Sequence, residues 1–167
     1  MAGALTQLMN MDLQIAILGT GDDYYERLLH GFSVGYPDKL AFRCTFDEPL
    51  SMRMYAGADF LLMPSQFEPC GLSQMMSMRY GTLPIVRKTG GLADTVEPYN
   101  EFDVSGDGYG FVNYNAHEMM GTIEYALRVF HERPEHHAVL MKNAMTKDFS
   151  WTVSAKRYSE LYDSINR

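Results

Sequence analysis

The sequence predicts an α/β fold with a mostly parallel sheet that is covered by helices on both faces. Short aliphatic runs typical of buried strands alternate with longer segments in which apolar residues recur every three or four positions. Strands that alternate with helices pair in parallel, because each helix carries the chain back across the sheet. The length of 167 residues suits one domain with a real core. We therefore expect a single three-layer domain over residues 1–167.

The composition and charge of the chain argue against some classes of binding partner. Hydrophobic residues make up 46% of the chain and charged residues 21%, which are ordinary values for a globular domain. The net charge of −7 argues against a surface that neutralises the many phosphates of a nucleic acid. No apolar run is long enough to cross a membrane, and residues 1–12 lack the pattern of a signal peptide. We expect a cytoplasmic or similarly reducing location, with neither nucleic acid nor membrane as a partner.

The expected strands share short apolar runs bounded by turn-forming residues. They are 13–18, 40–45, 60–63, 83–86 and 110–112. The segment 99–109 is acidic and holds two glycines, so we expect a surface loop there.

The expected helices share apolar residues at spacings of three and four. They begin after Asp22, near residue 50, after Gly71, at residue 93, after Asn115, at residue 135 and after Trp151. Asp22 or Asp23 is expected to cap the first of these, and Asn113 or Asn115 the long one that ends before Pro134. Residues 1–12 are small and apolar and have no cap, so we expect the end of a helix that begins outside the chain.

A polar loop follows strand 60–63, at an edge of the sheet where open α/β folds bind ligands. Gly71 lets the backbone approach a ligand closely, and the amides of Gly71, Leu72 and Ser73 can bind an anion such as a diphosphate. Ser73 can equally be no more than a helix cap. The carboxylate of Glu68 would repel phosphate, so it suits the hydroxyl groups of a sugar.

A second polar loop follows strand 83–86 and is expected to lie beside the first. Arg87 and Lys88 supply cations, and Thr89, Gly90 and Gly91 supply free amides. Most basic pairs are simply solvated, and it is the neighbouring loop that favours a binding role here.

Other candidate residues have simpler explanations. Phe46, after strand 40–45, can stack on a planar base, although a buried aromatic is the default. Cys44 is expected to be a small buried apolar residue. Gly19 and Gly21 lie between a strand and a helix, but the dinucleotide-binding fingerprint needs a third glycine where Tyr24 stands. The five histidines show no metal-binding spacing and are expected at the surface or its boundary, so we expect neither a metal nor a cofactor.

Several ordered motifs resemble the family of bacterial glycogen synthases and plant starch synthases (glycosyltransferase family 5). The motifs are PSQFEPCGLSQ at 64–74, MRYGTLP at 78–84 and RKTGGLADTV at 87–96. The likeness runs from about Leu13 to the end of the chain. It implies the Rossmann-like C-terminal half of a two-domain GT-B glycosyltransferase, lacking part of its first strand–helix unit.

The resemblance also implies an activity. The family transfers glucose from ADP-glucose to the non-reducing end of an α-1,4-glucan with retention of configuration, and amides and cations stabilise the departing ADP. The glucan would bind through an N-terminal domain outside this chain, to which the terminal helix 151–167 would cross. The 167 residues alone are therefore expected to be inactive, and the location is expected to be the cytoplasm of a bacterium or the stroma of a plant plastid.

The family's site residues transfer by position. Phe46 stands where an aromatic residue, usually tyrosine, stacks on adenine. Glu68 and Cys70 are the catalytic candidates, in the segment that holds the glucose. The residues implied to bind the substrate are Phe46, Ser65, Gly71, Leu72, Ser73, Thr89, Gly90 and Gly91.

The chain departs from the sequence pattern of this family at two places, and other functions stay open as alternatives. Related glycosyltransferases carry a second glutamate for the ribose where this chain has Met76. The cations that hold the distal phosphate have no match here. A GT-B enzyme that uses UDP-sugars, or a noncatalytic glucan- or protein-binding module of the same fold, therefore remains an alternative.

Overall fold

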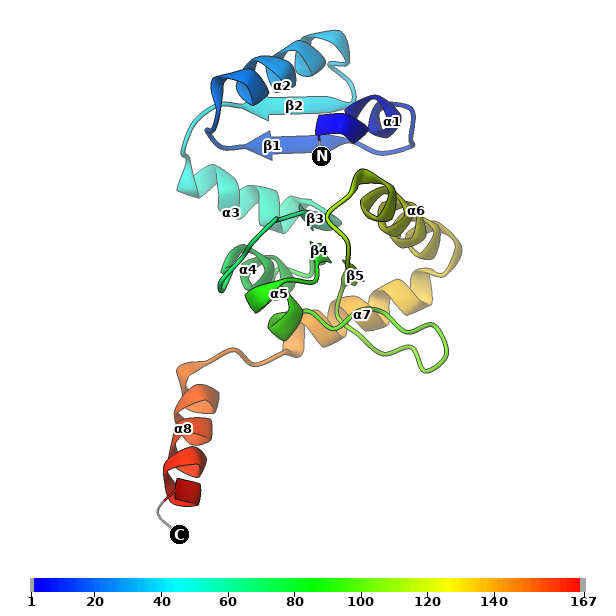
Figure 1. The fold of residues 1–167 in the computed structure, drawn as a ribbon. Coiled ribbons are helices and arrows are strands. Elements are labelled where there is room, and N and C mark those ends of the chain that lie inside the picture. The colour runs from blue at the N-terminus through cyan, green and yellow to red at the C-terminus, as the bar shows by residue number, and fades with distance from the viewer. Residues whose placement is uncertain (1, 166–167) are drawn as a thin grey trace.

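Parallel strands alternate with helices along the chain, which confirms the predicted fold class (Figure 1). The structure is a computed structural model that describes residues 2–165. The strands are β1 (Ile15–Leu18), β2 (Leu40–Arg43), β3 (Phe60–Met63), β4 (Leu83–Arg87) and β5 (Tyr109–Phe111). Each lies on one of the predicted runs, and every pairing between them is parallel.

The hydrogen-bonded sheet is in two parts, where the sequence suggested one. β1 pairs with β2, and β3, β4 and β5 form a separate sheet in that order. The backbone amides of Ile15 and Gly19 donate to carbonyl groups at the two ends of β2. Because successive residues of a strand direct their backbone groups to opposite sides, the amide and carbonyl of Ala16 point to the edge of β1 that faces away from β2. Within residues 2–165, that edge of β1 and the outer edge of β3 have no strand beside them.

The helices follow the predicted order, with shifted bounds. A short 3-10 turn, η1 (Ala2–Ala4), precedes α1 (Leu5–Met9). The others are α2 (Asp23–Gly35), α3 (Glu48–Gly57), α4 (Ser73–Arg79), α5 (Gly90–Thr95), α6 (Ala116–Glu132), α7 (Pro134–Thr146) and α8 (Trp151–Ile165). The side chains of Asp22 and Asn115 cap α2 and α6 by accepting from the amides of Tyr24 and Glu118.

The core lies around β4, the middle strand of the larger sheet. Its residues Leu83 to Val86 are all buried, as expected of a parallel strand covered on both faces. Helices α4, α5, α6 and α7 all pack against β4 (Figure 1). The largest fully buried apolar side chains are those of Leu5, Leu8, Leu40, Met78, Leu83, Val86, Leu92, Tyr109, Met119 and Leu140.

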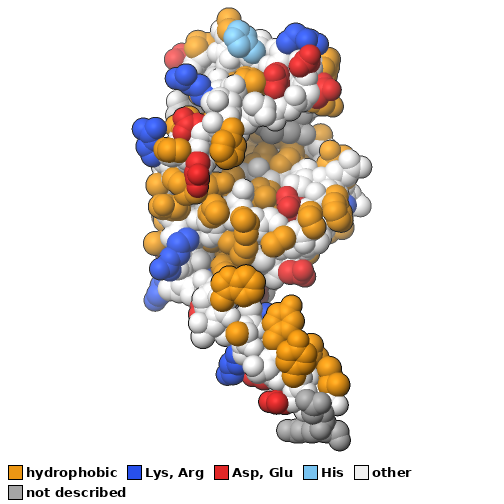
Figure 2. Space-filling model, turned by 90° about the vertical axis from the view of Figure 1, so that its left-hand side faces the viewer, with side chains coloured by type: hydrophobic (Ala, Val, Ile, Leu, Met, Phe, Trp, Pro, Cys, Tyr) orange, Lys and Arg blue, Asp and Glu red, His pale blue; other side chains and the backbone are white. Residues whose placement is uncertain are grey.

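Helix α8 extends away from the body of the molecule (Figure 1). None of its described residues is buried, and its apolar side chains form a row along one side of the arm (Figure 2). Tyr158, Leu161 and Tyr162 are each more than half exposed. Among residues 2–165, no helix is long and apolar enough to span a lipid bilayer.

Three sequence-based expectations are wrong. Cys44 is exposed rather than buried, because it lies beyond the end of β2, outside the sheet. His137 is 7% exposed, packed against the rings of Phe60 and Phe130. The segment 99–109 is only partly a surface loop: its tip is exposed, but residues 106–109 are buried because they run back into the sheet beside β4.

Candidate functional site

The carbonyl groups at the exit of β3 are held by a side chain from β4. Nη1 of Arg87 donates to the carbonyl oxygens of Ser65 at 3.3 Å and Gln66 at 2.7 Å, and Nε donates to that of Val112 at 3.1 Å. The guanidinium fork therefore ties together the ends of β3, β4 and β5. Arg87, which the sequence suggested as a cation for a ligand, thus already uses Nε and Nη1 within the protein, whereas Lys88 is exposed.

The two glycine-containing loops interlock through their backbones. The amide of Gly91 donates to the carbonyl oxygen of Glu68 at 3.0 Å. A Cβ atom at Gly90 would lie 2.1 Å from that same oxygen, and one at Gly91 would lie 2.0 Å from the carbonyl oxygen of Cys70. The glycines thus let one loop rest directly on the other. The structure brings Glu68, Cys70, Gly90 and Gly91 together, as the sequence predicted for two neighbouring loops.

The segment that leads into α4 turns sharply at Gly71, whose φ of +73° lies in the left-handed region. Helix α4 begins at Ser73, with Leu72 as the N-cap residue and no side-chain capping bond. The alternative explanation of Ser73 as a side-chain cap is therefore wrong. The amides that follow the turn are free of intrahelical partners, as at any helix start.

Two residues that sequence reasoning missed hold this segment in place. The buried side chain of Gln74 donates to backbone carbonyls of the turn and to the hydroxyl of Thr95 on α5. The available signal was a polar residue one turn before Met78, on the face of α4 that Ser77 and Met78 also share. A buried amide needs partners, and Gln74 finds them in the loop.

The remaining predicted residues differ in exposure. Glu68 is partly buried, Cys70 is exposed, and Leu72 is 60% exposed. Phe46 is 88% exposed at the end of β2, so the default of a buried aromatic does not hold. Thr89 is the N-cap residue of α5 and makes no side-chain capping bond. No hydrogen bond or ring contact among the described residues joins Phe46 to the interlocked loops.

The side of the molecule that carries α3, α4 and α8 shows many apolar side chains (Figure 2). Phe67 is 76% exposed, Met76 37% and Tyr80 49%, and together with Leu72 they lie on α4 or close to its two ends. This apolar surface adjoins the interlocked loops. A ligand seated there would therefore meet apolar surface beside free amides, a combination common in binding sites for small molecules.

Titratable groups outside the loops are held by local hydrogen bonds. The amide of Gly21 lowers the pKa of Glu26, and Glu26 in turn raises the pKa of the Cys44 thiol by accepting its hydrogen bond. This makes Cys44 a poor nucleophile. In the part of the chain that the structure describes, no three His, Cys, Asp or Glu residues gather closely enough to hold a metal ion.

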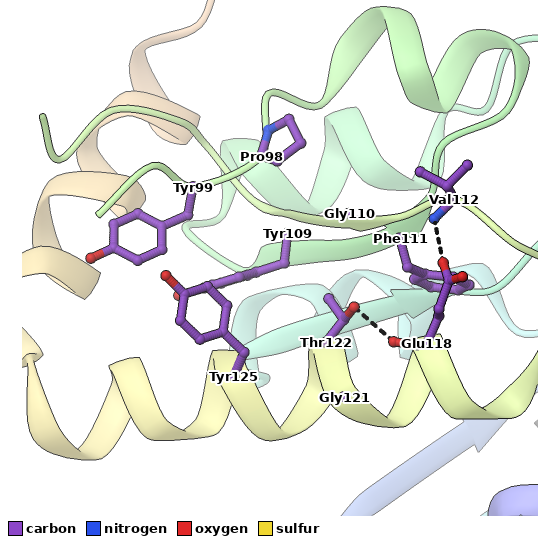
Figure 3. Close-up of a pocket in the computed structure, with 10 residues that line it drawn as sticks. All are labelled: Pro98, Tyr99, Tyr109, Gly110, Phe111, Val112, Glu118, Gly121, Thr122 and Tyr125. Carbon is purple, nitrogen blue, oxygen red and sulfur yellow. Dashed lines mark hydrogen bonds between the residues drawn. The ribbon is translucent and has the colours of Figure 1, made fainter. Parts of the chain in front are cut away.

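A cavity of about 350 Å³ lies between β5 and α6, away from the interlocked loops (Figure 3). Its polar groups mostly have partners within the protein: Glu118 accepts from the amides of Val112 and Asn113, and Thr122 donates to the Glu118 carbonyl. Burial raises the pKa of Tyr109, which packs between Tyr99 and Tyr125. Among the described residues the buried hydroxyl of Tyr109 has no hydrogen-bond partner, and none of the predicted site residues lines this cavity.

Comparison with known families gives one match over most of the chain. The family model described as glycosyl transferases group 1 matches residues 2–145, which include both glycine-containing loops. This agrees with the resemblance drawn from the motifs at 64–74 and 87–96.

Similar curated proteins are named glycogen synthases. That of Lachnospira eligens is 48% identical over 164 residues, or 98% of this chain and 34% of its own length. That of Streptococcus mutans is 50% identical over 161 residues, or 96% of this chain and 34% of its own length. The chain thus spans about a third of the length of these relatives.

Among solved structures, the catalytic domain of starch synthase IV from Arabidopsis thaliana, bound to ADP and acarbose, superposes with a TM-score of 0.84. It is 32% identical, and the match covers 99% of this chain and 35% of that one. Sucrose-phosphate synthase from Thermosynechococcus elongatus has a TM-score of 0.70 at 23% identity, over 98% of this chain and 41% of its own. The second likeness shows the fold alone, and both agree with the C-terminal half of a GT-B fold.

Proposed function

Because this chain belongs to the glycosyl transferases group 1 family, we propose that it is the donor-binding domain of a glycogen or starch synthase. The observation that carries the proposal is the identity of 48% to glycogen synthase over 98% of the chain. The interlocked loops, which contain most of the candidate site residues, lie within that match. The reaction is the transfer of glucose from ADP-glucose to the end of an α-1,4-glucan.

The loop geometry supports a division of roles in binding the donor. The free amides of Gly71, Leu72 and Ser73 follow a sharp turn and suit the oxygens of a diphosphate, with the exposed Lys88 on the neighbouring loop. Glu68 suits the sugar, because a carboxylate accepts hydrogen bonds from hydroxyl groups but repels phosphate. The donor would therefore lie across the first loop, with glucose on the side of Glu68.

Two further residues would complete donor binding. The exposed ring of Phe46 is available to stack on the adenine. Cys70, exposed beside Glu68, would contact the glucose. During transfer, amides and cations would stabilise the charge that develops on the departing diphosphate.

The test is a domain graft. In the glycogen synthase of Streptococcus mutans, the 161 matched residues are replaced by those of this chain, and glucose transfer from ADP-glucose to glycogen is measured. We expect transfer by the grafted enzyme, and a loss of about 100-fold or more in kcat when Glu68→Gln is added, as is typical when a group that orients or stabilises the reacting sugar is removed.

The donor nucleotide is tested in the same enzyme. Transfer from UDP-glucose but not from ADP-glucose would replace the proposal with a UDP-sugar enzyme of the same fold. Binding of glycogen by the 167-residue chain itself, without affinity for ADP or UDP, would favour a noncatalytic glucan-binding module. Titration of the 167-residue chain with ADP and with UDP gives an independent comparison of the two nucleotides.

A further inference from the structure

The side chain of Gln74 is buried at the base of the first loop. It lies in the first turn of α4 and is 0% exposed. Its Nε2 donates to the carbonyl oxygen of Gly71 at 2.9 Å, to that of Cys70 at 3.1 Å and to the hydroxyl of Thr95 at 3.0 Å. One side-chain amide therefore contacts two consecutive carbonyl groups of the turn and a hydroxyl on α5.

These bonds close a circuit between the two loops. The hydroxyl of Thr95 donates to the carbonyl oxygen of Gly91 at 2.5 Å, and the amide of Gly91 donates to the carbonyl oxygen of Glu68 at 3.0 Å. The circuit thus runs from Gln74 through Thr95 and Gly91 to Glu68, and back through Cys70. Hydrogen bonds in such a network support one another, so loosening one of them loosens both loops.

The chemistry of the circuit requires an amide at this position. All three partners of Nε2 are oxygen atoms, and the Thr95 proton is already used, so a donor is needed at this end of the side chain. The other end, Oε1, is buried and has no hydrogen-bond partner among the described residues. A Cβ atom at Gly71 would lie 2.5 Å from Oε1, so the turn and this side chain fit only with glycine.

We propose that Gln74 is a positioning residue that couples the two loops and sets the conformation in which they hold the donor. It touches neither sugar nor nucleotide, and acts through the carbonyls of Cys70 and Gly71 and through Thr95. The consequence for donor binding rests on the function proposed above. The coupling between the loops follows from the hydrogen bonds alone.

The coupling is tested by amide hydrogen exchange at Gly91, measured by NMR in the 167-residue chain. Gln74→Met keeps the length of the side chain and removes the donor, and we expect exchange at Gly91 to be about 5- to 10-fold faster, as for the loss of one supporting hydrogen bond. The matched control is Ser77→Ala, since Ser77 is equally buried one turn later and bonds only to the Gln74 carbonyl oxygen. That control should leave exchange at Gly91 unchanged.

A second variant keeps the test valid if Gln74→Met folds poorly. Thr95→Val breaks the circuit at its midpoint, and its effect on Gly91 exchange should not add to that of Gln74→Met. Unchanged exchange at Gly91 in both variants, or fully additive effects, would overturn the coupling. Equal acceleration in Ser77→Ala would also overturn it, because the effect would then reflect only a weakened helix.

Donor binding is tested in the grafted enzyme. For Gln74→Met we expect the KM for ADP-glucose to rise about 5- to 10-fold, and for Ser77→Ala to leave it unchanged. A normal KM in Gln74→Met together with fast Gly91 exchange would refute the positioning role. If the parent graft is inactive, the proposed function fails, while the exchange measurement still decides the coupling.

Discussion

The substitution Gly91→Ala tests whether the two loops must rest on each other. The added Cβ would lie 2.0 Å from the carbonyl oxygen of Cys70 and 2.6 Å from its carbonyl carbon, both of them backbone atoms. The loops would have to separate by roughly 1 Å or more before such a contact became an ordinary one. That movement would break the hydrogen bond from the Gly91 amide to Glu68.

The expected loss of stability combines two terms. Overpacking a tight site costs about 1–3 kcal/mol, and loss of a hydrogen bond about 1 kcal/mol, which gives about 2–4 kcal/mol. For a chain of this size the melting temperature should fall by about 5–15 °C. The control is Gly31→Ala in α2, where an added Cβ meets nothing within 4 Å, and where alanine should stabilise the helix by about 0.5–1 kcal/mol.

Thermal unfolding followed by circular dichroism measures both variants in the 167-residue chain. If Gly91→Ala melts as high as Gly31→Ala, the loops do not need their close contact, and the geometric argument for Gly91 is refuted. In the grafted enzyme, Gly91→Ala should also weaken the binding of ADP-glucose.

Three further predictions concern other parts of the molecule. Lys147→Met leaves the buried carboxylate of Asp107 without its ammonium partner, so urea unfolding should show a loss of about 1–3 kcal/mol, and an unchanged midpoint would contradict this. Burial lowers the pKa of His137 in the folded state, so the unfolded chain binds the extra proton and stability should fall as the pH drops below 6.5. His137→Phe should flatten that part of the melting-temperature profile, and a profile as steep as before would exclude His137 as its cause. Phe46→Ala should weaken ADP binding about 3- to 10-fold in calorimetric titration without changing the melting temperature, and unchanged affinity would remove Phe46 from the site.

The order of strands and helices could be predicted from the sequence because it depends on local signals. The apolar run of β4 predicts a buried strand, and the capping residue Asp22 predicts the start of α2, each from only a few neighbouring positions. The nearness of the two loops was also predictable, since both leave parallel strands at the same edge of the sheet.

What the sequence could not show depends on contacts between distant segments. The start of α5 at Gly90 looked like a loop, because two glycines normally break a helix. They are there because backbone from residues 68–70 occupies the space of their side chains. The sequence suggests Arg87 as a ligand-binding cation, since its three carbonyl partners, which come from two loops distant in sequence, cannot be foreseen. The roles of Phe46 and Cys70 in binding a donor stay predictions.

The division of the sheet has a consequence for how these 167 residues behave as an isolated sample. The open edge of β3 presents a run of apolar residues, Phe60 to Met63, with no charge or proline to discourage another strand. Such an edge is a template for pairing between molecules. The isolated chain should therefore self-associate as its concentration rises.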